Sequence, residues 1–408
     1  MNTLTAEFIR LHAHDDVKTL ALQGARNADV DMPFVLNQIA GRQTAQKKLP
    51  AWAAVDDILY PPHLSMEQCS SEPTARYKAE LAAQAIQAAH QSSSPVTLVD
   101  LTGGFGVDFS FMARAFQQAV YVERQVHLCE LASHNLAALG VAAEVVNADA
   151  ETYLQEMGNV TMVFLDPARR DNQGGRTYGI ADCTPNVLEM LPSLLQKAEM
   201  VMLKLSPMLD WKKTVSDLDG TLAHAGYTEF GVMEVHIVAV DNECKELLVL
   251  IGRKTEVPLT VVCKNDEAVF AYMPVSELLS AASYVAPQPG NQLLVPNAAL
   301  MKAGCFAELE HRYGVHQIAV NSHLMVSDAR IVDFPGRHFT VDAICTMNKK
   351  ELREALRDIR QANVAVRNFP MSVDELRKRL KIKEGGSVFI FATTLTDQKR
   401  VLLVCSKK

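Results

Sequence analysis

The sequence predicts an α/β protein built around a largely parallel sheet, and three patterns support this. Residues 96–116 read as a strand, a glycine cluster and then a helix. Four successive predicted strands each end in a carboxylate or a glycine turn. Two further strands, expected at 229–240 and 245–252, are joined through Asp241-Asn242, and so short a connection requires antiparallel pairing. We therefore expect a parallel sheet that ends in one antiparallel hairpin.

The first 92 residues are expected to form a helical region. Apolar residues recur at helical intervals over 5–11, 15–22 and 33–47, partly behind Asp residues that could act as caps. Prolines then indicate an extended stretch around residues 50–62. A further helix is expected at 79–89, directly before the first strand of the sheet.

The glycine cluster after the first strand has the composition of a nucleotide-binding loop. Gly104 and Gly106 let the backbone turn sharply and approach a ligand closely. Asp100 closes the strand, where it can accept hydrogen bonds from a cationic or hydroxyl group. Glu123 lies 19 residues after Gly104, where doubly wound folds place a ribose-binding carboxylate. A dinucleotide fingerprint would need a third glycine, but Phe109 stands there.

The remaining strands continue this pattern. Strands are expected at 119–122, before Glu123, at 144–147, before Asp149, and at 161–165, before Asp166-Pro167. This series, with Asp100-x-x-x-Gly104-x-Gly106, resembles the successive motifs of class I S-adenosylmethionine-dependent methyltransferases over about residues 96–253.

The resemblance implies a Rossmann-like, seven-stranded methyltransferase sheet with an antiparallel last strand, over residues 93–255. It implies S-adenosyl-L-methionine as the cofactor. Thr102 stands where many members of the family have a first glycine. The positions implied to bind the methionine part, the ribose and the adenine of the cofactor are Asp100, Thr102, Gly103, Gly104, Gly106, Glu123, Arg124, Asp149, Ala150 and Asp166.

The fourth strand of such enzymes presents the group to be methylated, so Asp166, Pro167 and Arg169 are the candidate catalytic residues. Amine-methylating members carry Asp or Asn, then Pro, Pro and an aromatic residue. Here Ala168 and Arg169 replace the last two, which leaves amine methylation open. Uracil-C5 enzymes need a cysteine after the fifth strand, but residues 204–207 contain none. The glycine-loop segment is also similar to a ribosomal-RNA guanine-N2 family.

Basic and polar side chains near these motifs are candidates for substrate binding. Lys78, Arg170, Arg176 and Lys204 would contact phosphate or base, the two arginines from a glycine-rich substrate loop at 168–179. The polar stretch over residues 68–78 has two interpretations. Ser71, Thr74 and Lys78 could cover the cofactor, or Ser70 or Thr74 could cap a helix.

The C-terminal part divides into two expected modules. Residues 256–335 indicate a small α+β module, of ferredoxin-like type, without a catalytic constellation. Its expected elements are strands at 259–263, 269–273 and 317–326, a helix at 297–313 and a linker-like loop at 286–292. Residues 336–408 indicate an α/β module with a strand to Cys345, a helix at 349–361, a strand at 363–368, a helix at 373–381 and a final hairpin. The order of these elements resembles the THUMP-like module of a bacterial methyltransferase family, and THUMP modules proper bind RNA.

The charge distribution favours the same partner. Residues 335–408 carry 16 Lys and Arg against 8 Asp and Glu, whereas the first 334 residues carry 24 against 39. A basic module joined to an acidic one suits phosphate binding, although charge alone fits a solvated helix face equally well.

Composition limits the remaining possibilities. Apolar residues make up 48% and charged residues 21% of the 408, which predicts a packed core. No apolar run reaches the length of a membrane span and no signal pattern opens the chain, so we expect a cytoplasmic protein without a membrane partner. The eight cysteines are scattered without metal-ligand spacing, so no metal is expected. The oligomeric state is left open.

These observations together predict a methyltransferase that modifies a base in structured RNA, with tRNA ahead of rRNA. One alternative keeps the enzyme but gives it a small molecule or a protein side chain as substrate. The other is a cofactor-binding, RNA-binding protein without turnover.

Overall fold

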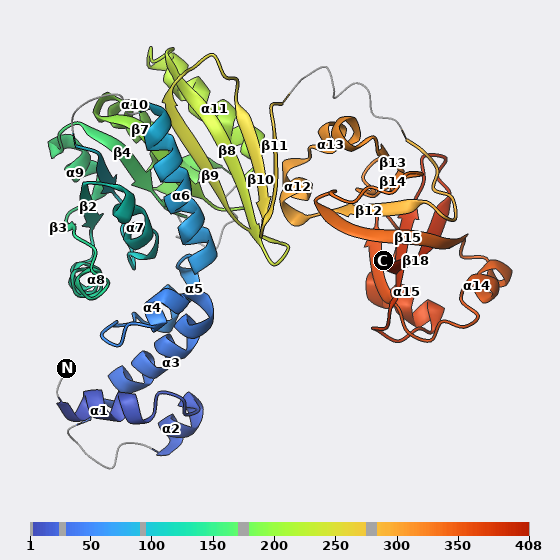
Figure 1. The fold of residues 1–408 in the computed structure, drawn as a ribbon, viewed down its shortest axis with the longest axis horizontal. Coiled ribbons are helices and arrows are strands. Elements are labelled where there is room, and N and C mark those ends of the chain that lie inside the picture. Colours follow the sequence, from blue (N-terminus) through green and yellow to red (C-terminus); the bar gives the residue numbers. More distant parts are fainter. Residues whose placement is uncertain (1–2, 24–29, 90–94, 170–178, 275–283, 408) are drawn as a thin grey trace. The chain divides into compact units, whose positions relative to one another are not determined.

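A computed structural model describes residues 3–23, 30–89, 95–169, 179–274 and 284–407 (Figure 1). The chain forms two compact units. The first comprises Met1–Val235 and Lys245–Pro258, and the second comprises His236–Cys244 and Leu259–Lys408. In the described residues, no helix has the length and apolar character needed to cross a membrane.

The first unit opens with the expected helical region. Its helices are α1 (Thr3–Leu11), α2 (Val17–Gln23), α3 (Met32–Lys48), α4 (Pro50–Ala53), α5 (His63–Gln68) and α6 (Glu72–Ala89). Asp31 caps α3 by accepting a hydrogen bond from the Phe34 amide, as the sequence predicted. The region is fastened to the sheet domain, because Trp52 Nε1 donates to Ser110 Oγ and the Leu59 amide donates to Asn135 Oδ1.

The strands of the first unit belong to a nine-stranded sheet with the order β3-β2-β1-β4-β7-β9-β8-β10-β11, in which β10 (Thr260–Asn265) and β11 (Ala268–Tyr272) follow the seven strands described next. These strands are β1 (Thr97–Asp100), β2 (Gln118–Glu123), β3 (Glu144–Asn147), β4 (Val160–Leu165), β7 (Ala198–Leu205), β8 (Phe230–Val240) and β9 (Glu243–Arg253). The first four and β7 pair in parallel, whereas β9 pairs antiparallel with β7. The predicted fold class, including the antiparallel strand, is therefore confirmed.

Helices connect these strands, and α6 crosses one face of the sheet (Figure 1). They are α7 (Val107–Met112) with the 3₁₀ turn η1 (Ala113–Ala115), α8 (Val126–Ala138), α9 (Ala150–Glu156), η2 (Ile180–Asp182), α10 (Val187–Lys197) and α11 (Trp211–His224). A small two-stranded sheet pairs β5 (Ala168–Arg169) with β6 (Cys183–Thr184). Strands β4 and β7 are buried over most of their length, which accounts for their nearly continuous apolar sequences.

The second unit contains a sheet of order β13-β14-β12-β15-β18-β17-β16. Its strands are β12 (Gln292–Pro296), β13 (His316–Gln317), β14 (Met325–Ser327), β15 (Gly336–Cys345), β16 (Asn363–Arg367), β17 (Val388–Thr394) and β18 (Arg400–Lys407). The remaining elements are the hairpin of β10 (Thr260–Asn265) and β11 (Ala268–Tyr272), with helices α12 (Ala298–Ala303), α13 (Phe306–Tyr313), α14 (Lys349–Ala355) and α15 (Val373–Leu380). Since β12 pairs with β15, the two expected C-terminal modules contribute to one sheet.

Several local expectations were wrong. Residues 50–53 form the short helix α4 rather than an extended stretch, because a proline at the first helical position has a backbone already suited to a helix. The strand expected at 317–326 is interrupted, because residues 318–324 connect the short strands β13 and β14. The helix expected at 297–313 is broken at Gly304, which has a φ of +67° and ends α12.

Other elements begin or end away from their expected positions. Helix α6 starts at Glu72, with Pro73 in its first turn, rather than at Ala79. Helix α14 ends at Ala355 instead of Gln361. Ser372 and Glu375 form a capping box at the start of α15.

Candidate functional site

The glycine loop between β1 and α7 folds closely over a side chain of β2. A Cβ atom at Gly103 would lie 2.2 Å from the ring of Tyr121, so only glycine fits there. The Tyr121 hydroxyl donates to the Gly104 carbonyl oxygen at 2.5 Å. Gly104 and Gly106 have φ values of +56° and +84°, in the left-handed region that favours glycine. The loop therefore leaves its backbone open at the carboxyl edge of the sheet.

Glu123, at the end of β2, holds this loop in place. One of its carboxylate oxygens accepts from the Gly104 amide at 3.0 Å, and the other accepts from the Gln125 amide at 2.8 Å. Asn147 donates to the carbonyl oxygens of Glu123 and Arg124, which fixes the end of β2 against β3. The buried Glu123 therefore lies beside the loop, as expected for a ribose-binding carboxylate.

The other predicted cofactor residues follow neighbouring parallel strands. Asp149 is the exposed residue before α9 and makes no side-chain capping bond, while Ala150 is buried behind it. Arg124 is exposed beside Glu123. The carboxyl ends of β1, β2, β3 and β4 share one edge, so the structure brings Asp100, Glu123, Asp149 and Asp166 to that edge.

Asp100 and Asp166 are connected through Thr102. The Thr102 amide donates to Asp100 Oδ1 at 2.9 Å, and Thr102 Oγ1 accepts from the Asp166 amide at 2.6 Å. Burial, with the charges of Asp108 and Asp166, raises the pKa of Asp100 to about 8. The threonine that replaces a first glycine thus ties the end of β1 to the end of β4.

A buried network of charged side chains lies directly behind this edge. Lys78 of α6 is fully buried, and its Nζ lies 2.6 and 2.7 Å from the two carboxylate oxygens of Glu246 on β9. The same Nζ lies 3.2 Å from Asp108 Oδ1 on α7. Ser70 donates to the other Asp108 oxygen at 2.7 Å. One lysine therefore joins a helix before the sheet to a strand 168 residues later.

Lys204, at the end of β7, continues the network to the surface. Its Nζ lies 2.5 Å from Asp166 Oδ2 and 3.4 Å from Asp108 Oδ2. Burial alone would lower the pKa of Lys204, but the carboxylates of Asp166 and Asp108 raise it far above its ordinary value. The side chains of Lys204 and Asp166 are 13% and 41% exposed, so this pair is the part of the network that a ligand can reach.

The carboxylates of the network differ in their titration. Burial raises the pKa of Asp108, but Lys78 and Lys204 more than reverse this and hold it below the ordinary value. Burial raises the pKa of Glu246, and Lys78 offsets only part of that effect. Asp108 is therefore charged at neutral pH and keeps both lysines in place.

The sequence-based substrate residues have different outcomes. Lys204 lies beside Asp166, which no local pattern required. Lys78 is buried behind it, so this geometry favours a role in holding Glu246 and Asp108 instead of the expected contact with phosphate or base. Pro167 is buried next to Asp166. The backbone of Arg169 pairs with Cys183, and Arg170 and Arg176 lie outside the described residues.

Sequence reasoning missed Asp108 and Glu246, and it gave Ser70 only as a possible helix cap. Asp108 stands among the apolar residues of α7, and Glu246 directly precedes a buried run in β9. These two residues could have been recognised from the sequence as charged residues at inward-facing positions of apolar elements, because a buried charge needs an oppositely charged or hydrogen-bonding partner. In the polar stretch before the sheet, Ser70 donates to Asp108 and Thr74 donates to the Ser71 carbonyl oxygen, so neither of these bonds caps a backbone amide.

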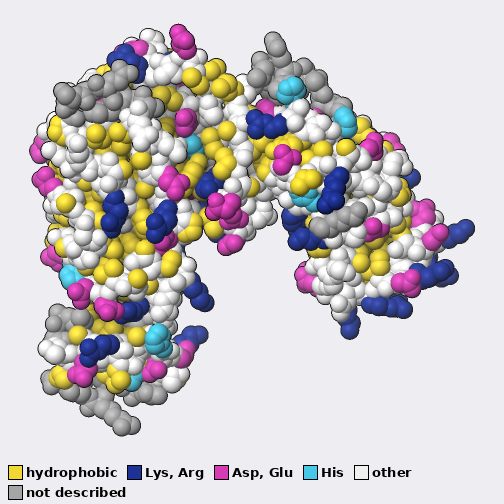
Figure 2. Space-filling model, in the orientation of Figure 1, with side chains coloured by type: hydrophobic (Ala, Val, Ile, Leu, Met, Phe, Trp, Pro, Cys, Tyr) yellow, Lys and Arg dark blue, Asp and Glu magenta, His cyan; other side chains and the backbone are white. Residues whose placement is uncertain are grey.

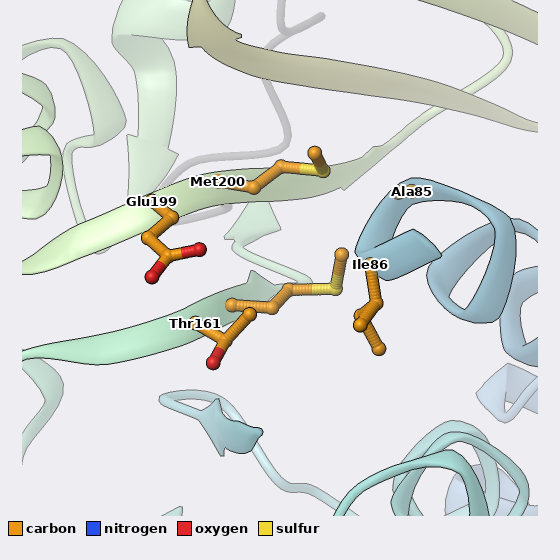
Figure 3. Close-up of a pocket in the computed structure, with 6 residues that line it drawn as sticks. Ala85, Ile86, Thr161, Glu199 and Met200 are labelled. Carbon is orange, nitrogen blue, oxygen red and sulfur yellow. The ribbon is translucent and has the colours of Figure 1, made fainter. Parts of the chain in front are cut away.

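A small hollow in the first unit lies at the opposite ends of the strands from the carboxyl edge (Figure 3). It is lined by Ala85 and Ile86 of α6, Thr161 and Met162 of β4, and Glu199 and Met200 of β7. Thr161 and Glu199 stand near the starts of their strands, whereas Asp166 and Lys204 stand at the ends. This hollow is mostly apolar and has no room for a water molecule, so the carboxyl edge remains the candidate site.

Comparisons with known proteins agree with the fold. A crystal structure of a protein assigned as a methyltransferase, from Porphyromonas gingivalis W83, is 30% identical with a TM-score of 0.82, and the match covers 99% of this chain and 97% of that one. Uncharacterized S-adenosylmethionine-dependent methyltransferases of two Mycobacterium tuberculosis strains, H37Rv and CDC 1551, are each 22% identical over 338 residues, covering 81% of this chain and 83% of theirs. Residues 293–335 match the model of a ferredoxin-like domain, and residues 336–407 match that of a THUMP domain-like module.

Proposed function

Since this chain belongs to the family of S-adenosylmethionine-dependent methyltransferases, we propose that it methylates structured RNA, with tRNA ahead of rRNA. The observation that carries this proposal is the strongly basic THUMP-like module on an otherwise acidic enzyme. A small molecule or a protein side chain, as substrate, would not require a basic module of this kind.

We assign the glycine loop and the neighbouring strand ends to the cofactor. The backbone at Gly104 would accommodate the methionine part, because a Cβ atom placed there would meet no side chain within 4 Å. Glu123 would hold the ribose hydroxyls, and the exposed Asp149 with Ala150 would face the adenine. When bound, the cofactor supplies a methyl group on a sulfonium. The chain has to align the acceptor with that methyl group and keep water away from both.

Asp100 predicts a pH dependence for cofactor binding. Its pKa of about 8 means that the carboxyl group is mostly protonated at neutral pH in the free protein. The ammonium of the methionine part favours the ionised form, so binding must release a proton below pH 8. We expect the affinity for S-adenosylhomocysteine, measured by calorimetry, to rise from pH 6 to pH 8 by up to about tenfold per unit, and then to level off.

The control for this prediction is Asp100→Asn, whose affinity should not change over the same range. Asp108 and Tyr121 are the neighbours with shifted pKa values, lowered and raised respectively, so neither titrates between pH 6 and pH 8. Equal affinities of the unaltered protein at pH 6 and pH 8 would show that Asp100 does not exchange a proton with the ligand.

The proposed RNA-binding surface is defined by exposed basic side chains of the THUMP-like module. Figure 2 shows Lys and Arg gathered over the end of the second unit that carries α14. Lys349 and Arg353 are four residues apart on α14 and therefore share one face. The other exposed basic residues of the module are Arg337, Lys350, Arg357, Arg360, Lys378, Arg379, Lys381, Lys383, Lys399, Arg400 and Lys407.

Charge reversal on α14 tests this surface. We expect Lys349→Glu with Arg353→Glu to weaken binding of bulk tRNA at least tenfold at low salt. The slope of log affinity against log salt should fall by about 1 to 2, because each lost phosphate contact removes close to one unit. Lys18→Glu with Lys47→Glu makes the same charge change on exposed helices of the first unit and should alter binding much less. Equal effects of both pairs, in mobility-shift titrations, would place the RNA elsewhere.

A further inference from the structure

The reachable end of the charged network presents two opposite groups side by side. Asp166 offers a carboxylate that accepts hydrogen bonds, and Lys204 offers an ammonium that only donates them. The pair lies next to the glycine loop, because the backbone amide of Asp166 donates a hydrogen bond to Oγ1 of Thr102. An acceptor atom that enters between the loop and this pair therefore meets one hydrogen-bond acceptor and one donor.

The orientation of Lys204 is fixed from behind. Asp108 contacts it at 3.4 Å, and Asp108 is itself held by Lys78 and Ser70. Lys78 is in turn anchored by both oxygens of Glu246. A surface ion pair would not need this support, so the network indicates that the position of the Lys204 ammonium matters for function.

A hydroxyl group complements this pair better than a base amine does. The hydroxyl donates its proton to the carboxylate, and its oxygen keeps two lone pairs, one for the ammonium and one for attack. The nitrogen of an exocyclic amine is conjugated with its base and offers no lone pair to an ammonium. The amine would leave Lys204 without a ligand partner and close to a sulfonium of the same charge.

The other acceptor chemistries lack their usual residues. Ala168 and Arg169 follow Pro167 in the sequence, where amine-methylating enzymes have a second proline and an aromatic residue to stack on the base. Covalent C5 chemistry needs a thiolate. Cys69 is the cysteine whose charge environment includes Asp108 and Lys204, and burial raises its pKa, which disfavours the thiolate.

We propose that the acceptor is a hydroxyl group held between Asp166 and Lys204, and that it is the ribose 2′-hydroxyl of an RNA nucleotide. The second part rests on the proposed RNA function. Within an RNA chain the 3′ and 5′ oxygens of each ribose are esterified, so the 2′-hydroxyl is the free one. This differs from the base methylation that the motifs first suggested.

The reaction balances without any further reactant. The acceptor oxygen forms a bond to the methyl carbon while the sulfur–carbon bond breaks, and that electron pair stays on sulfur. The hydroxyl proton passes to the carboxylate of Asp166 and from there to water. Lys204 stays protonated throughout and donates to the acceptor oxygen, so it orients the attacking lone pair and is not the base.

Nucleoside analysis of labelled RNA tests the proposal. The full-length protein is incubated with deuteromethyl-labelled S-adenosylmethionine and total RNA from cells that lack it, and the RNA is digested to nucleosides for mass spectrometry. We expect the label on the ribose fragment, and we expect the labelled linkage to resist alkaline hydrolysis. Label on a base fragment would overturn the hydroxyl proposal but leave the RNA function standing.

Absence of label from all RNA would overturn both proposals together. Lys204→Arg and Lys204→Gln add a second measurement, because both variants remove the lysine but only arginine keeps a charged donor. We expect arginine to retain at least ten times more ribose label than glutamine at equal RNA affinity. Equal labelling by the two variants would contradict the assigned role of the ammonium.

Discussion

Replacement of Asp166 by asparagine is expected to lower kcat by about 10²- to 10⁴-fold, the range typical for loss of a group that accepts a proton during reaction. Asparagine has a side chain of the same size, and its backbone amide can still donate a hydrogen bond to Thr102 Oγ1. Its side-chain amide, however, cannot accept the proton of the hydroxyl group. An amine acceptor would tolerate the change, since an amide oxygen still accepts its hydrogen bond. Single-turnover methyl transfer at saturating RNA and cofactor measures the step directly.

Asp217→Asn provides the matched control. Asp217 forms an ion pair with Lys213 on the surface of α11, with 2.7 Å between the Lys213 Nζ and an Asp217 carboxylate oxygen. Exposed pairs of this kind contribute about 0–1 kcal/mol, so both stability and turnover should stay close to those of the unaltered protein. Full activity of Asp166→Asn with an unchanged melting temperature would show that Asp166 does not accept the proton.

The parts of this site that were predictable follow from local sequence. Asp100 and Glu123 are the last residues of their strands and Asp166 directly follows one, and parallel strands bring such positions to one edge of the sheet. The glycines were likewise visible beside them. The end of a strand and the loop that follows it are only a few residues apart, so the local sequence pattern is enough to predict where both lie.

The network behind the edge could not be predicted in this way. Lys78 and Glu246 are 168 residues apart, and neither α6 nor β9 has a local pattern that requires the other. Lys78 was therefore interpreted as a residue that contacts phosphate or base, and Glu246 was not singled out in its predicted strand. The same reason applies to the second unit, where β12 and β15 pair although they come from two expected modules. Long-range pairing is decided by packing of the whole unit.

The largest effect on stability is expected for Lys78→Met. Methionine fills the volume of the lysine stem but leaves Glu246 buried without its cation and Asp108 with only Lys204. Removal of one partner of a buried ion pair costs about 3–5 kcal/mol, because the remaining charge is neither hydrated nor compensated. Denaturant unfolding of the full chain at pH 7 and pH 8 should show this loss.

The pH dependence of that loss follows from Glu246. Burial already raises the pKa of Glu246 with Lys78 present, and loss of the lysine raises it further. A carboxyl group with a raised pKa in the folded state is tolerated there in its protonated form. Ionisation of this group therefore destabilises the folded state as the pH rises above 4.5, the ordinary pKa of Glu246, and the destabilisation shrinks as the pH falls. The difference in unfolding free energy between Lys78→Met and the unaltered protein should therefore be smaller at pH 5.

The double variant Lys78→Met with Glu246→Leu separates the charge effect from loss of packing. It removes the unpaired charge and keeps two apolar side chains of similar volume, so we expect it to recover most of the lost stability. Activity should not recover with it, because Asp108 still lacks Lys78 and can no longer hold Lys204 firmly beside Asp166. A double variant as unstable as Lys78→Met would mean that the lysine stem, rather than its charge, is what the buried site requires.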